Sequence, residues 1–164
     1  MPILVRTLLF TLFIPGSVVG LVPWWILRET RGADALALGL LAPLGFALIA
    51  VGPLVYLPCA RDFLRVGRGT PFPLDPPREF VATGLYRWTR NPMYVGFAAT
   101  LAGEALAFGS WPLALWAASM VLVWHLFVVF HEEPDLRRRF GASYERYCAE
   151  VPRWIPRPRH ESRP

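Results

Sequence analysis

Long uncharged stretches alternate with arginine-rich ones along the chain. Leu8 to Leu27 carries no charged residue over 20 positions, and Ala35 to Ala60 carries none over 26. At about 1.5 Å of rise per residue, each can form a helix that crosses a hydrocarbon core about 30 Å thick. The pattern therefore predicts two transmembrane helices within residues 1–60, bent at the prolines and glycines inside them.

Two further apolar stretches follow residue 90. Pro92 can begin a helix at its first turn, where the missing N–H costs nothing, and this helix is expected to run to about Phe108. Gly109-Ser110 then forms a turn before Trp111 to Phe130. Because the turn is so short, the two helices should form an antiparallel hairpin. The prediction is an all-α integral membrane protein with about four transmembrane helices.

The first apolar stretch has an alternative interpretation as a cleaved signal peptide. Only Arg6 precedes it, and it is longer than the usual apolar region of such peptides, about 7–15 residues. We therefore expect a retained span, with Trp24 and Trp25 as anchors at the membrane interface.

The arginines flank the apolar stretches. All 17 basic residues are arginine, and Arg61 to Arg90 carries six of them against three acidic residues. The middle of this segment, Thr70 to Pro77, is rich in proline and should be an extended or turn-rich loop. The positive-inside rule places the 61–90 loop and the C-terminus in the cytoplasm. We interpret the net charge of +5 as topology and lipid-headgroup contact and not as nucleic-acid binding.

The C-terminal segment shows a helical period. Leu136, Phe140, Tyr144, Tyr147 and Val151 are spaced four, four, three and four residues apart, which predicts an amphipathic helix on the membrane surface. The proline-containing segment 151–156 should end this helix and fold back, and Pro158 to Pro164 is expected to be disordered. The two cysteines, Cys59 and Cys148, have neither metal-ligand spacing nor a disulfide pattern.

Two polar clusters lie at the ends of the predicted hairpin, on the same side of the membrane. Arg87, Arg90, Asn91 and Tyr94 lie at its entrance, and Glu132-Glu133 lies at its exit. Carboxylates can bind an ammonium group or a ribose diol, and arginine can bind a carboxylate in a fork. Aromatic rings nearby can stack on a heterocycle or face a cation. The alternative is that these are solvated side chains at span ends.

Two features inside the hairpin have open interpretations. His125 is seven residues before Glu132 and should share its helix face, and an ionisable residue inside a span is a functional candidate. Gly96 and Gly103, with Ala99 between them, form a small-residue face. This face either lets the next helix approach or leaves room for a ligand, and packing is the favoured interpretation.

A family resemblance rests on these residues. The run Gly84-Leu85-Tyr86-Arg87 followed by Arg90 to Gly96 resembles the signature G-x-Y-x-x-x-R-H-P-x-Y-x-G of the isoprenylcysteine carboxyl methyltransferase and phospholipid methyltransferase superfamily. Glu132-Glu133 resembles the paired glutamate of that family, and residues 140–156 resemble its closing segment. Asn91 departs from the pattern, because the family commonly has histidine there.

The resemblance implies a membrane methyltransferase that uses S-adenosylmethionine, with residues 61–157 as its cofactor-binding core. The implied cofactor-site residues are Tyr86, Arg90, Asn91, Pro92, Tyr94, Gly96, Glu132, Glu133 and Tyr144. Arg87 is a candidate for orienting an anionic substrate, and His125 is a candidate general base for an amine substrate.

The acceptor would be lipid-borne. The favoured one is the carboxylate of a prenylcysteine-like group, with a phospholipid amine or a thiol as alternatives. The rival functions are a membrane reductase that uses NADPH and a non-catalytic membrane subunit. The short chain favours a bacterial inner-membrane protein.

Overall fold

The first long helix is one continuous helical segment. The structure, a computed structural model, describes residues 3–30, 39–67 and 80–157; the predicted loop 70–77 and tail 158–164 lie outside these ranges. Helix α1 (Ile3–Phe13), a π turn (Ser17–Leu21) and α2 (Val22–Glu29) follow one another in a single helical segment, Ile3–Glu29, long and apolar enough to cross a membrane. The first predicted span is therefore helical, with a π turn two residues after Pro15.

The second long helix lies further along the chain than its charge-free stretch suggested. A 3-10 turn (Gly39–Leu41) leads into α3 (Ala42–Asp62), in which Pro43 occupies the first turn, and a π turn (Phe63–Gly67) extends it. The span was predicted at 35–60, but the described helix continues past Arg61, Asp62 and Arg65. A helix does not need to end where the bilayer does, so the charged residues did not mark its end.

The hairpin is present with the predicted turn. Helix α4 (Pro92–Ala107) ends before Gly109, whose φ of 57° is in the left-handed region. Helix α5 (Trp111–Phe127) begins with the Ser110 side chain accepting a bond from the Leu113 N–H. A π turn (Val128–Glu132) and α6 (Glu133–Phe140) continue it, so the predicted end at Phe130 falls inside a longer helix.

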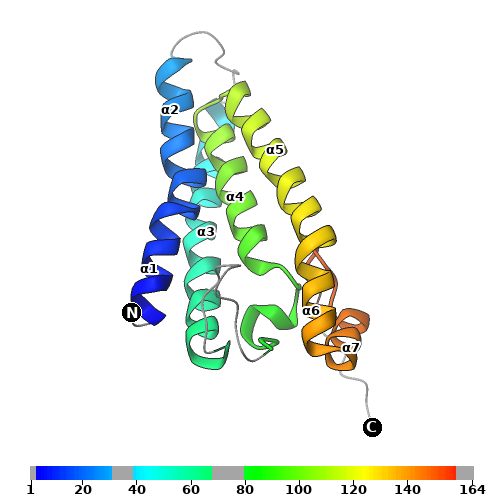
Figure 1. The fold of residues 1–164 in the computed structure, drawn as a ribbon. Coiled ribbons are helices and arrows are strands. Elements are labelled where there is room, and N and C mark those ends of the chain that lie inside the picture. The colour runs from blue at the N-terminus through cyan, green and yellow to red at the C-terminus, as the bar shows by residue number, and fades with distance from the viewer. Residues whose placement is uncertain (1–2, 31–38, 68–79, 158–164) are drawn as a thin grey trace.

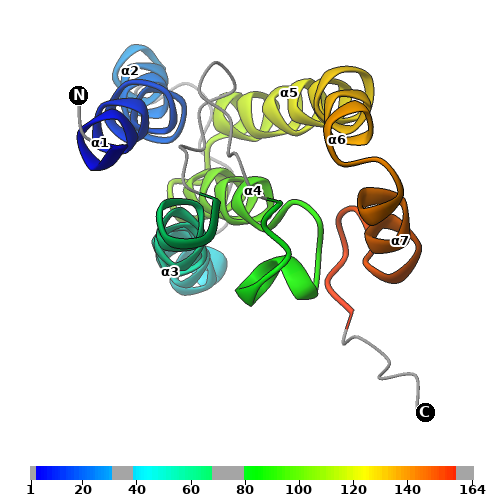
Figure 2. The same ribbon diagram turned by 60° about the horizontal axis from the view of Figure 1, so that its bottom comes forward.

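Every regular element in the described ranges is a helix, which confirms the all-α prediction. Consecutive elements join into three helical segments that are long and apolar enough to span a membrane: Ile3–Glu29, Ala42–Gly67 and Trp111–Phe140. Helix α4 has 16 residues and lies between α3 and α5, flanked by the α1–α2 segment (Figures 1 and 2). A fourth crossing by α4 remains a prediction.

The small-residue face of α4 packs against α3. A Cβ added at Gly103 would lie 2.6 Å from the Gly45 carbonyl oxygen, and one at Gly96 would lie 3.1 Å from the Val55 Cβ. Packing was therefore the correct interpretation of these glycines, but the partner is the preceding helix and not the following one. This close contact fixes α4, and with it the residues at its N-terminus.

The C-terminal amphipathic segment is two helices, not one. Helix α6 ends at Gly141, where φ is 51° and ψ is −130°, and α7 (Ala142–Glu150) begins there. The Phe80 ring lies 5.4 Å from that of Phe140 and 5.0 Å from that of Tyr147 between centroids. The aromatic side of this segment therefore packs on Phe80, and its position on the membrane surface remains a prediction.

Candidate active site

The C-terminal segment lies alongside the entrance of the hairpin. The Arg90 N–H donates to the Pro152 carbonyl at 2.9 Å, and the Arg157 N–H donates to the Trp88 carbonyl at 3.1 Å. Between these two bonds, the Thr89 hydroxyl lies 3.0 Å from the Arg153 carbonyl. This backbone pairing covers the polar entrance, so residues more than 60 positions apart form one wall.

Glu133 joins three elements at this wall. Its carboxylate accepts two bonds from Arg153, at 2.7 and 3.1 Å, and one from Arg90 at 3.0 Å. Arg137 lies 3.5 Å away, and the Glu133 side chain is only 3% exposed. The hydrogen bond with Glu133 also raises the pKa of Arg153. Glu133 therefore fastens the C-terminal segment and Arg90 to α6.

Glu132, its neighbour, has a different environment. Its Oε2 accepts a bond of 3.2 Å from the Tyr94 hydroxyl of α4. None of the ion pairs among the described residues includes Glu132. Successive residues of a helix point about 100° apart, which is why the two adjacent carboxylates meet different partners. Glu132 is thus a carboxylate held by a hydroxyl and not by a cation.

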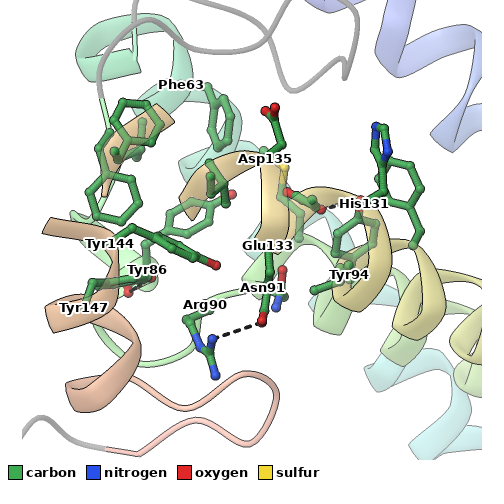
Figure 3. A pocket seen from close by; sticks show the side chains of 18 of the residues that line it. Phe63, Tyr86, Arg90, Asn91, Tyr94, His131, Glu133, Asp135, Tyr144 and Tyr147 are labelled. Carbon is green, nitrogen blue, oxygen red and sulfur yellow. Dashed lines mark hydrogen bonds and ion pairs between the residues drawn. The ribbon is translucent and has the colours of Figure 1, made fainter. Parts of the chain in front are cut away.

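A cavity opens between these groups (Figure 3). Its lining combines polar side chains from both ends of the hairpin with aromatic rings from the long helices, segment 80–86 and α7. The lining residues from the hairpin and its flanks are Arg90, Asn91, Met93, Tyr94, Phe97, Phe127, Val128, His131, Glu132, Glu133, Asp135, Leu136, Arg139 and Phe140. The others are Phe10, Tyr56, Phe63, Phe80, Val81, Tyr86, Tyr144 and Tyr147.

Most of the cofactor-site residues expected from the sequence line this cavity. They are Tyr86, Arg90, Asn91, Tyr94, Glu132, Glu133 and Tyr144. Pro92 and Gly96 are not in its lining; both are buried, Pro92 at the first turn of α4 and Gly96 against α3. Their contribution is to place Asn91 and Tyr94.

The two residues expected to be catalytic lie elsewhere. The His125 Nδ1 accepts a bond of 3.1 Å from the Trp154 indole N–H, and Arg87 lines a second cavity beside α7. His125 was expected to share a face with Glu132, but the π turn at 128–132 lies between them. A π turn holds one residue more than an α turn, which rotates the following side chains by roughly 100°.

Asn91 bonds to the C-terminal segment. Its Nδ2 donates to the Arg153 carbonyl at 3.1 Å, and the residue is 8% exposed. An imidazole N–H placed there can donate in the same way. The departure from the usual histidine therefore keeps a hydrogen-bond donor at this position.

The sequence interpretation missed several groups at this site. Phe80 comes from a polar connection with no periodic pattern, and Arg153 pairs with Glu133 across 20 positions. The helical spacing did mark Tyr147, whose hydroxyl donates to the Tyr86 carbonyl at 2.6 Å. Burial raises the pKa of Tyr144 and Tyr147, so both phenols stay neutral.

The donor set suits a ligand with an anionic and a cationic part. Arg90 lines the cavity, and its buried Nε has no hydrogen-bond partner among the described residues. An unsatisfied buried donor is costly, and a ligand carboxylate would satisfy it. Glu132 can accept from an ammonium group or a ribose diol, and the rings can face a sulfonium or an adenine. The chemistry of S-adenosylmethionine fits these residues.

The chain is similar to known methyltransferases. A family model described as phospholipid methyltransferase matches residues 40–143. Protein-S-isoprenylcysteine O-methyltransferase of Schizosaccharomyces pombe is 38% identical over 78 residues, which is 46% of this chain. The matched part is 32% of that relative, so the chain spans about a third of its length.

Proposed function

The chain belongs to the phospholipid methyltransferase family, and from this premise we propose that it transfers a methyl group from S-adenosylmethionine to the carboxylate of a prenylcysteine-like lipid. The observation that carries the proposal is the convergence of Arg90, Tyr94 and Glu132 on one cavity that is also lined by aromatic rings. A cationic cofactor and an apolar acceptor can meet there.

The residues that would hold the cofactor follow from their chemistry. Glu132, oriented by the Tyr94 hydroxyl, would bind the ammonium group or the ribose hydroxyls. The Arg90 Nε would donate to the carboxylate, and the rings of Tyr86 and Tyr144 would line the remaining surface. The bound cofactor supplies a methyl group on a positively charged sulfonium.

The protein contributes alignment and the exclusion of water. Glu133 and Arg153 hold the C-terminal segment alongside the entrance of the hairpin, so the reacting groups would meet in a site formed before the cofactor binds. Holding two reactants in line lowers the entropic part of the barrier. Because charge disappears from the sulfonium as the methyl group moves, polar groups fixed in advance are worth more than mobile water.

An anionic acceptor suits the rim of the cavity. Arg139 of α6 lines the cavity and carries a positive charge. Phe10, Tyr56, Phe97 and Phe127 offer an apolar surface to a lipid chain. A carboxylate is itself the nucleophile and needs no general base, which agrees with the position of His125 beside Trp154.

The proposed topology places this site at the cytoplasmic face of a bacterial inner membrane. Segment 80–91 and helices α6 and α7 lie at one end of the helix bundle, which is also the end where α1 begins (Figure 1). The arginines of this end are expected in the cytoplasm by the positive-inside rule.

Transfer of labelled methyl groups tests the proposal. The full chain in detergent is incubated with methyl-labelled S-adenosylmethionine and either an S-prenylated cysteine or phosphatidylethanolamine. A methyl ester releases its label as methanol in alkali, whereas an N-methyl group does not. We expect alkali-labile label on the prenylated cysteine and its loss in Glu132→Gln.

Two results would contradict parts of the proposal. Alkali-stable label on phosphatidylethanolamine would show that the acceptor is an amine and not a carboxylate. Absence of S-adenosylmethionine binding to a folded chain would remove the cofactor assignment altogether.

A further inference from the structure

A second cavity lies behind the aromatic wall of the first. It is lined by residues of segment 80–87 and of α7: Phe80, Ala82, Arg87, Ser143, Arg146, Tyr147, Glu150 and Val151. Phe80 and Tyr147 line both cavities, and their ring centroids are 5.0 Å apart in an edge-to-face contact. The bond from the Tyr147 hydroxyl to the Tyr86 carbonyl, 2.6 Å long, holds this wall in place. The two cavities are therefore separate sites.

The second cavity brings together two guanidinium groups that are far apart in sequence. Arg87 comes from the 3-10 turn Gly84–Arg87 and Arg146 from the middle of α7. Both side chains are exposed. The Ser143 hydroxyl, one turn before Arg146, also lines the cavity but already donates to the Phe140 carbonyl at 2.8 Å, so the two guanidinium groups are the donors that the lining offers. Guanidinium forks are donors that proteins use for phosphate oxygens.

The lining of the second cavity carries more positive than negative charge. Glu150 follows Arg146 by four residues on α7, the spacing at which a helix can pair opposite charges. Arg87, which the neighbouring segment supplies, adds a second positive charge to the same lining. The lining therefore carries two positive charges against one negative charge.

We infer that the cavity between segment 80–87 and α7 is a binding site for a phosphate group, held by Arg87 and Arg146. The same chemistry is offered by an anionic phospholipid headgroup and by free phosphate. The inference does not depend on the methyltransferase activity, because none of the charged residues in this cavity lines the first one.

The test is calorimetric titration of the full chain in a sugar detergent, which brings no phosphate of its own. The probes are inorganic phosphate, dihexanoyl phosphatidylglycerol and, as the phosphate-free control, dihexanoylglycerol. The wild-type chain should bind the phosphatidylglycerol saturably and the dihexanoylglycerol at least tenfold more weakly, since charge-assisted bonds of this kind are worth about a factor of ten or more each.

The variants assign the site. Arg87→Gln and Arg146→Gln should each weaken binding about tenfold, and Glu150→Gln should strengthen it about threefold because it removes the opposing charge. Arg138→Gln is the matched control: it makes the same charge change at an exposed α6 residue outside both linings. Its affinity should stay within about twofold of the wild type.

The outcomes separate the sources of the phosphate. If the two arginine variants bind both inorganic phosphate and phosphatidylglycerol more weakly, the site is a general phosphate site. If they bind only phosphatidylglycerol more weakly, it is a headgroup site. If Arg138→Gln lost as much affinity as Arg87→Gln and Arg146→Gln, the binding would be general charge attraction, and the inference would be overturned. Equal binding of dihexanoylglycerol, or no saturable binding of either phosphate probe, would also overturn it.

Discussion

At the scale of single residues, two adjacent glutamates, Glu132 and Glu133, bond to different partners. Both line the cavity, but Glu133 is surrounded by three arginines and is almost fully buried, whereas Glu132 accepts only from Tyr94 among the bonds described. Their sequence positions alone make them equivalent, and only their partners distinguish the carboxylate that is held by arginines from the one proposed to bind the ligand.

Matched substitutions test this division. Glu133→Gln leaves Arg90 and Arg153 without their counter-charge, so we expect a loss of about 3 kcal/mol in the free energy of unfolding. Glu132→Gln should leave that free energy within about 1 kcal/mol but lower the affinity for S-adenosylmethionine at least tenfold. Thermal unfolding in detergent and calorimetric titration measure the two effects. Equal loss of stability in both variants would contradict the division.

The side chain of Asn91 gives a second prediction at this scale. Asn91→Ala removes the bond to the Arg153 carbonyl, which should raise hydrogen exchange over residues 151–157 by about tenfold. Asn91→His keeps a donor and should retain most of the protection. Exchange that is unchanged in Asn91→Ala would show that this bond does not hold the segment.

At the scale of elements, the hairpin α4–α5 brings the residues of the site together, and the π turn at 128–132 sets the direction of the side chains that follow it. The short turn at Gly109-Ser110 places Arg90 and Glu133 at the same end, as the sequence predicted, and their side chains meet at 3.0 Å. The π turn then changes which residues face the cavity, so His125 contacts Trp154 while His131 lines the cavity.

The packing of α3 on α4 gives a prediction at the scale of elements. A Cβ at position 103 would lie 2.6 Å from the Gly45 carbonyl oxygen and 2.8 Å from the Ile49 nitrogen, both backbone atoms that cannot rotate away. Gly103→Ala should therefore lower the free energy of unfolding by about 2 kcal/mol. Thermal unfolding in detergent measures it.

Gly20→Ala is the matched control for this substitution. Its added methyl group would meet nothing within 4 Å, so stability should be unchanged or slightly higher, since alanine favours a helix. If both variants lost the same stability, the contact between α3 and α4 would not be the cause.

At the scale of the whole molecule, the site lies at one end of the helices, where segment 80–91, α6 and α7 meet (Figure 2). The helices place the end of α2 at the opposite end (Figure 1). In a membrane these two ends would face different compartments.

Cysteine labelling tests this arrangement. In a Cys148→Ser background, Ser143→Cys on α7 should react with a membrane-impermeant maleimide only in inside-out vesicles. Glu29→Cys at the end of α2 should react only in right-side-out vesicles, because both residues are exposed but lie at opposite ends. Labelling of both from the same side would exclude a membrane-spanning arrangement of the first helix.

The sequence by itself determined the helical class, the hairpin and the family of the protein. These depend on local properties: uncharged length, a proline at a helix start, a two-residue turn and a closely spaced signature. The tertiary structure decided which of these residues act together. The π turn and the glycine conformation at Gly141 interrupt the long helical segment, and the pairing of residues 151–157 with 88–91 depends on contacts between distant segments. Those contacts separate Glu132 from Glu133 and move Arg87 and His125 out of the cavity, because a side chain's direction is set by everything packed around its helix.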